Sequence, residues 1–209
     1  MIIRKYVSDL LLSNMYILEE GGHGLVIDPC NNIEPGEGLC IDKILLTHEH
    51  YDHISGVNLW KEAYHTGVLC SKACADNICN PKKSLVRYFD VFCEIQDWVK
   101  IDEVPSVDFA YACTAEETFD DELIFEWQSH KVHLFTLPGH SKGSIGILVD
   151  DYDFFSGDSV MGEEKVELRL PGSSPKLWKE VAVPRLEMLP KDLCVHPGHF
   201  EEYRLQKGG

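Results

Sequence analysis

Apolar residues along this chain fall in short runs that turn-forming residues separate. In the first part of the sequence these runs predict strands, at 2–8, 14–19, 24–28 and 41–46. Apolar residues then recur at the spacing of one helix face, at Ile54, Val57, Trp60 and Tyr64. This order predicts a β-meander and a further strand that leads into a helix.

The last third of the chain repeats that order. Apolar runs predict strands there, at 132–137, 144–149, 152–155 and 193–195. Before the last of these strands, the spacing of apolar residues predicts a helix from Pro175 to Leu189. Strands followed by helices in each half predict an α/β fold, with two sheets packed together and helices outside them.

Residues 70–128 show no single period. Aromatic residues occur in this segment without a regular spacing, at Tyr88, Phe89, Phe92, Trp98, Phe109 and Tyr111. We expect residues 70–128 to form a cap over a functional site. The length of 209 residues suits one core, so a single domain over 1–209 is predicted.

The composition narrows the classes of partner. The 35 acidic and 19 basic residues give a formal net charge of −16, which would repel a phosphate backbone and argues against nucleic acid as a partner.

The first residues lack the pattern of a secretory signal or a membrane span, since Asp9 precedes Leu10 and no cleavage site follows. A soluble, cytoplasmic protein with reduced thiols is expected. The sequence gives no indication of the oligomeric state.

The stretch THEHYDH, from Thr47 to His53, places three histidines and an aspartate directly after an apolar run. Buried imidazole and carboxylate groups need partners, so adjoining ones indicate a shared ligand. Loops with similar groups follow other apolar strands, at 138–144 (PGHSKGS), 156–159 (SGDS) and 196–199 (HPGH). This recurrence predicts a common centre at one edge of the sheets.

The spacing in the first loop favours two metal ions. His48 and His50 lie two apart on an extended chain and can point the same way, whereas Asp52 and His53 follow where the chain turns. We expect one ion on the first pair and a second ion on the other. Further ligands would come from distant loops, where His140 and His199 are available and Asp158 can bridge.

These residues resemble the metallo-β-lactamase superfamily. Its H-x-H-x-D-H motif is matched at His48, His50, Asp52 and His53, and later parts of its pattern are matched at His140, Asp158 and His199. The resemblance implies a four-layer αββα sandwich with a metal pair at the sheet edge. It also implies the ligand grouping, with one ion on His48, His50 and His140 and the other on Asp52, His53 and His199.

Two positions narrow the branch of that family. True β-lactamases of this fold commonly carry cysteine where Asp158 stands, so the resemblance points to the metallohydrolase branch that includes glyoxalase II. Diiron flavoprotein oxidoreductases of this fold carry glutamate at the position of His50. The histidine here suits two zinc ions, and imidazole also binds iron or manganese.

The sequence therefore predicts a metal-dependent hydrolase of the glyoxalase II-like, thioesterase kind. A hydroxide between two metal ions would attack a small thioester or ester carbonyl, with Asp52 and Asp158 as catalytic residues. The substrate is expected to be a small molecule, anionic or carbonyl-bearing. Two alternatives stay open at this point: an oxidoreductase similar to mononuclear iron persulfide dioxygenases, and a metal-binding module without turnover.

Several further residues are weaker candidates. Tyr51, Lys142 and Arg169 are predicted to contact substrate, because they lie within or near the motif loops or in a region where relatives bind substrate. Asp52 is also predicted to cap the helix that follows it. His196 is expected to be a surface histidine, with a role beside a metal ligand as the alternative.

Overall fold

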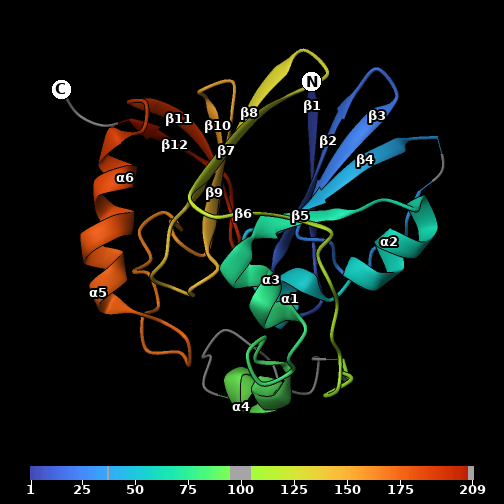
Figure 1. Cartoon of the computed structure of the whole chain (residues 1–209), viewed down its shortest axis with the longest axis vertical. Helices are drawn as coiled ribbons and strands as arrows, with labels where there is room; N and C mark the ends of the chain where they lie inside the picture. The colour runs from blue at the N-terminus through green and yellow to red at the C-terminus, as the bar shows by residue number, and fades with distance from the viewer. Residues whose placement is uncertain (37, 95–104, 207–209) are drawn as a thin grey trace.

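The computed structural model describes residues 1–36, 38–94 and 105–206. Two six-stranded sheets face each other in the middle of the molecule, and helices cover the outer face of each (Figure 1). This is the αββα sandwich that the sequence predicts.

The first sheet contains the strands of the N-terminal half in chain order. β1, β2 and β3 pair antiparallel, and β4, β5 and β6 then add in parallel. Their bounds are Ile2–Val7, Asn14–Glu20, His23–Ile27, Cys40–Leu45, Val68–Ser71 and Glu117–Phe119. Because β3 and β4 are parallel, their carboxyl ends lie at the same edge of the sheet, where Asp28 and the motif loop follow them.

The second sheet has the order β12-β11-β10-β9-β8-β7. All its pairs are antiparallel except β10 and β11, which are parallel. Its strands are Glu122–Trp127, His130–Thr136, Ile145–Val149, Asp153–Gly157, Asp192–Pro197 and Tyr203–Gln206. The parallel pair brings Asp158 and His199, which follow β10 and β11, to one edge of this sheet.

The short helices form the outer layers. In the first half they are α1 (Tyr51–Ile54), α2 (Val57–Tyr64), α3 (Lys72–Ile78), the 3₁₀ turn Val86–Tyr88 and α4 (Phe89–Glu94). Their buried side chains pack on the first sheet around Trp60, whereas the two sheets enclose a separate core around Tyr16 and Phe155. A third core, with Phe154 and Leu193, lies between the second sheet and the C-terminal helices.

The predicted C-terminal helix consists of three consecutive parts. α5 covers Pro175–Leu177, a π-helical turn covers Trp178–Ala182, and α6 covers Val183–Met188. Pro184 lacks an N–H and its ring collides with the preceding turn of a regular α-helix, which explains the widened π turn before it.

The middle of the chain differs most from its sequence pattern. Segments within 70–128 that had no clear period belong to β5, β6 and β7 or to α3 and α4, and α4 lies beyond α1 and α3 at the lower end of the view (Figure 1). Trp98 lies outside the described residues. The cap over the site and the single domain stay predictions.

One local prediction is wrong. His50, rather than Asp52, occupies the cap position of α1, because the helix begins at Tyr51 and Asp52 lies within its first turn. No helix in residues 1–36, 38–94 and 105–206 is long and apolar enough to cross a membrane.

Candidate metal centre

The motif loop begins directly after β4 and leads into α1. His48 and His50 lie on the loop between β4 and α1, and Asp52 and His53 lie in the first turn of α1. The seven side chains predicted as metal ligands all lie buried at this edge of the sandwich, at His48, His50, Asp52, His53, His140, Asp158 and His199. The structure thus brings together side chains from four separate loops.

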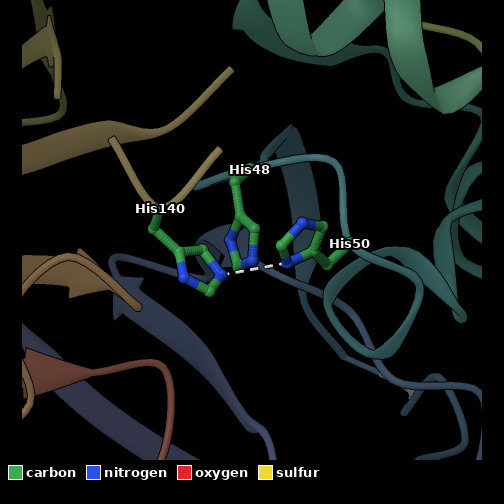
Figure 2. A group of neighbouring side chains, drawn as sticks. All are labelled: His48, His50 and His140. Atoms are coloured by element: carbon green, nitrogen blue, oxygen red, sulfur yellow. Dashed lines mark hydrogen bonds between the residues drawn. The ribbon is translucent and has the colours of Figure 1, made fainter. Parts of the chain in front are cut away.

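His48, His50 and His140 form the first group (Figure 2). Their rings point toward one another, and one ligand nitrogen from each lies within 4.8 Å of the other two. Nε2 of His140 lies 2.9 Å from Nδ1 of His50. A cation shared by these lone pairs would satisfy all three imidazoles at once.

Asp52, His53 and His199 form the second group, again with ligand atoms within 4.8 Å of one another. Oδ2 of Asp52 lies 3.3 Å from Nε2 of His53 and 3.4 Å from Nε2 of His199. Two imidazoles and one carboxylate are a ligand set that divalent transition metals favour.

Asp158 lies between the two groups. Its Oδ2 atom is 3.4 Å from Nε2 of His140 in the first group and 3.4 Å from Nε2 of His199 in the second. Its Oδ1 atom is 3.4 Å from Nε2 of His53. One carboxylate therefore faces both groups, as the predicted bridging role requires.

The buried polar atoms at this centre fit a metal site. Nε2 of His48, Nε2 of His53 and Oδ1 of Asp158 are fully buried and make no hydrogen bond. Such atoms are costly to bury unless a partner satisfies them, and all three are atoms that metal ions bind. The residues present thus fit a pair of divalent ions.

The far side of each ring fixes which nitrogen faces the centre. Nδ1 of His53 lies 3.0 Å from the Asp28 carboxylate, and Nδ1 of His199 lies 3.0 Å from the Leu11 carbonyl oxygen. Nδ1 of His140 lies 3.1 Å from the Glu167 carbonyl oxygen. Each Nδ1–H donates to its oxygen, so the lone pair of Nε2 points inward, as a metal ligand requires.

Burial and neighbouring charge keep the imidazoles of the first group neutral and the Asp158 carboxylate ionised. Burial lowers the pKa of His50 to about 3, and burial together with the neighbouring His53 holds the pKa of His48 well below its usual value. Burial opposes ionisation of Asp158, but the charges of His199 and His53 outweigh it and hold the Asp158 pKa well below its usual value. Neutral imidazoles and an ionised carboxylate are the forms that bind metals.

Positive charge is favoured in the second group. Burial alone would lower the pKa of His199, but the Asp158 and Asp52 carboxylates raise it to about 9. The same two carboxylates that favour a proton on this imidazole also favour a cation beside it.

Glu49 joins the loops that carry the first group. Its buried carboxylate accepts hydrogen bonds from the Ser141 hydroxyl at 2.7 Å and from Nδ2 of Asn77 at 2.7 Å. Ser141 follows His140, whereas Glu49 stands between His48 and His50 in the sequence. The contact therefore sets the distance between the two loops.

Glycine is required at one position beside the centre. A Cβ atom on Gly198 would lie 2.1 Å from Oδ1 of Asp158 and 2.9 Å from Cε1 of His53. The loop after β11 therefore approaches Asp158 this closely only because residue 198 has no side chain.

A cavity of about 520 Å³ opens onto the centre. Five of the predicted ligands line it, and so do Tyr51 and Arg169. Lys142 is exposed and is not among the lining residues that the structure describes, so the fold does not bring it to the predicted substrate site. Arg169 is also exposed, and its guanidinium pairs with the Glu167 carboxylate at 2.6 Å.

Sequence reasoning missed two buried carboxylates and misplaced one histidine. Asp28 gave only the weak signal of a polar residue after a strand, and Glu49 was hidden among the histidines of the motif.

His196 is not a surface residue: it is 3% exposed, and its ring nitrogens lie 2.8 Å from Asp153 and 3.0 Å from Glu202. Its ring stacks on Phe155 within the sandwich, because the side chains of β11 alternate between the two faces.

Comparison with known sequences adds two relatives. The chain is 26% identical over 211 residues to a probable metallo-hydrolase of Streptococcus pyogenes, covering 95% of this chain and 84% of the relative. It is 24% identical over 191 residues to a hydroxyacylglutathione hydrolase of a Shewanella species, covering 91% of this chain. The chain spans 58% of the length of that second relative.

Solved structures share the fold. BLEG-1, a B3 metallo-beta-lactamase, superposes with a TM-score of 0.76 at 19% identity, covering 97% of this chain and 94% of BLEG-1. TTHA1623 in a di-iron-bound form superposes with a TM-score of 0.67 at 24% identity, covering 96% of this chain and 93% of that protein. A family model, described as the metallo-beta-lactamase superfamily, matches residues 8–199. The predicted family is thus confirmed, and this chain belongs to the metallo-β-lactamase superfamily.

Proposed function

We propose that this protein is a binuclear metal-dependent hydrolase that cleaves a small thioester or ester at its carbonyl carbon. The observation that carries the proposal is the position of Asp158, whose carboxylate faces both groups of imidazoles at the floor of a cavity. One ion would be held by His48, His50 and His140, and the other by Asp52, His53 and His199. Zinc is the metal we propose, and the same ligands suit iron or manganese.

Divalent ions at this centre would supply a water of lowered pKa, near 7, and an electrophile for the substrate carbonyl. Asp52 lines the cavity, so its carboxylate can accept a proton from the reacting water and pass it toward the leaving group. Burial raises the pKa of Tyr51 to about 12, with Asp108 and Asp9 adding to the effect. The Tyr51 phenol therefore stays protonated at neutral pH and can donate a hydrogen bond to a bound substrate.

Two comparisons support hydrolysis as the reaction. The Streptococcus pyogenes relative is described as a probable metallo-hydrolase, and the Shewanella relative is named as a hydroxyacylglutathione hydrolase. Because TTHA1623 was solved in a di-iron-bound form, iron is the alternative to zinc as the native metal of this protein.

The proposal is tested by metal analysis followed by assay. Protein purified without added metal is analysed for zinc, iron and manganese, stripped with a chelator, and reloaded. We expect two ions per chain and metal-dependent release of thiol from a thioester. His133→Asn, on the β8 strand where the ring lies 3.1 Å from Glu122, serves as a control that should keep both ions. One iron per chain with oxygen uptake and no thiol release would instead indicate an oxidoreductase.

A further inference from the structure

The cavity has apolar lining residues as well as the polar centre. Besides the polar centre and charged residues between 163 and 169, apolar side chains from separate segments line the cavity: Leu11, Leu85, Phe89, Phe92, Met161, Leu170 and Phe200. A group of apolar side chains beside a few convergent polar groups is typical of a site that binds the apolar part of a ligand and orients one functional group.

α4 supplies two aromatic side chains of this wall. Phe89 is buried, and its ring packs edge-on against Tyr51 with centroids 5.5 Å apart. Phe92 lies three residues further along, on the same face of the helix, and remains half-buried at the cavity. Val91, between them, points to solvent with 55% of its surface exposed. The helix thus turns its two phenylalanines toward the cavity that leads to the centre.

Three residues of the wall have backbone in the left-handed region, and Leu85 is one of them, with φ of 67°. Leu11 has φ of 52° and Phe200 has φ of 67°, a conformation that bulky side chains rarely adopt. Their carbonyl oxygens are both used, since Leu11 accepts from Nδ1 of His199 and Phe200 accepts from Nδ2 of Asn14 at 2.8 Å. The contacts that fix the backbone here also hold two large apolar side chains at the cavity, beside a metal ligand.

The charged groups at the cavity do not suit a polyanion. Glu163, Glu164 and Glu167 line it together with Lys165 and Arg169, so carboxylates outnumber cations among these residues. The Arg169 guanidinium is engaged twice by Glu167, from Nε at 2.9 Å and from Nη2 at 2.6 Å. A substrate with two carboxylates, such as a glutathione thioester, would have to compete with Glu167 for this cation.

We infer that the substrate is a thioester or ester whose acyl group is an apolar chain or ring, lying along α4, and whose leaving group carries at most one carboxylate. This inference rests on the proposed function. Water adds to the carbonyl carbon, the bond from that carbon to sulfur or oxygen breaks, and the thiol or alcohol leaves with a proton. The other product is the apolar carboxylic acid.

The test compares three thioesters on the metal-loaded protein. S-acetyl and S-octanoyl N-acetylcysteamine share a neutral thiol, and S-octanoyl glutathione carries the same acyl group on a thiol with two carboxylates. We expect kcat/KM for the octanoyl ester of the neutral thiol to exceed the acetyl value by about tenfold or more, since several methylene groups enter an apolar pocket. It should also exceed the value for octanoyl glutathione.

Two variants of α4 locate the effect. Phe92→Ala should lower the octanoyl-to-acetyl ratio at least about threefold, because the truncated side chain no longer contacts the acyl chain. Val91→Ala, on the solvent side of the same helix, should leave the ratio unchanged. Thermal unfolding of both variants checks that the helix is intact.

Each outcome decides one claim. Equal rates for acetyl and octanoyl esters, or a preference for octanoyl glutathione, would overturn the apolar substrate and leave hydrolysis standing. If no thioester is cleaved, the proposed function fails, and calorimetric binding of octanoate and acetate then judges the cavity alone. Tighter binding of octanoate, weakened by Phe92→Ala, would support an apolar ligand, and equal binding would refute it.

Discussion

The Asp28 carboxylate lies 3.0 Å from Nδ1 of His53, and both residues are buried. The same carboxylate accepts from the Thr47 backbone N–H at 2.7 Å and from the Thr47 hydroxyl at 2.5 Å. Asp28 therefore connects the end of β3 to both ends of the motif loop. It fixes the ring of one predicted ligand without facing the centre itself.

The first prediction concerns this contact. Asp28→Ala should weaken metal binding about 10- to 100-fold, because His53 loses the acceptor that orients its ring. Competition with a chelator measures the affinity. Asp42→Asn is the matched control, since Asp42 also lies against Nδ1 of a histidine, His23, at 2.8 Å, but away from the centre. Equal affinities in both variants would show that Asp28 does not position His53.

Removal of the bridging carboxylate gives the second prediction. Asp158→Ala should lose one or both ions and most of the activity, since Asp158 contacts imidazoles of both groups. The number of ions per chain, measured after gel filtration, is the readout. Asp153→Asn, in the β10 strand, should keep both ions. Unchanged stoichiometry in Asp158→Ala would exclude a bridging role.

The third prediction uses the glycine beside the centre. Gly198→Ala places a methyl group where Oδ1 of Asp158 now lies, so Asp158 or the loop must move. We expect loss of metal binding and a lower melting temperature. Gly36→Ala is the control, because a Cβ there would meet nothing within 4 Å. Native metal affinity in Gly198→Ala would contradict the close approach of residue 198 to Asp158.

The fourth prediction tests the link between the two loops. Glu49→Ala removes the acceptor of Ser141 and Asn77 and leaves buried donors unpaired, which should cost about 1–3 kcal/mol in the free energy of unfolding. Because Ser141 follows His140, affinity for the metal in the first group should fall as well. Glu62→Ala, on the exposed side of α2, should change neither quantity. Lower stability with unchanged metal affinity would limit Glu49 to a packing role.

A pH dependence of stability is the fifth prediction. A hydrogen bond to Asp150 and a contact with Glu20 raise the pKa of His130, at a site remote from the metal centre. The folded protein therefore binds this proton more tightly than the unfolded chain, so the added stability is complete below pH of about 6.5 and disappears as pH rises through the raised pKa.

Melting temperatures of the native protein and of His130→Gln, taken from pH 5.5 to 9, measure this effect. The difference between the two proteins should be largest at the acidic end and shrink toward alkaline pH. A difference that grows with pH would mean that His130 is stabilised in its neutral form.

The fold class and the residues proposed as metal ligands were readable from the sequence. Metal-binding side chains follow strands directly, so the motif His48-x-His50-x-Asp52-His53 and the later His140, Asp158 and His199 could be identified from local order alone. Strand and helix periods are likewise local properties, because each depends on which face of one element is buried. These signals predicted most strands of both sheets and the C-terminal helix.

Other features depend on contacts between residues far apart in the chain. β5 and β6 are short and pair with each other, Leu69 with Glu117, across a long stretch of chain, so their sequences carry little period of their own. Asp28 gains its role only because β3 and β4 lie parallel and end at the same edge, and His196 is buried only because β11 is an inner strand. The sequence thus determined which residues have the chemistry to bind metal. The tertiary structure decided which nitrogen faces the centre, which carboxylate supports it and which apolar walls surround it, because those depend on packing that no local pattern encodes.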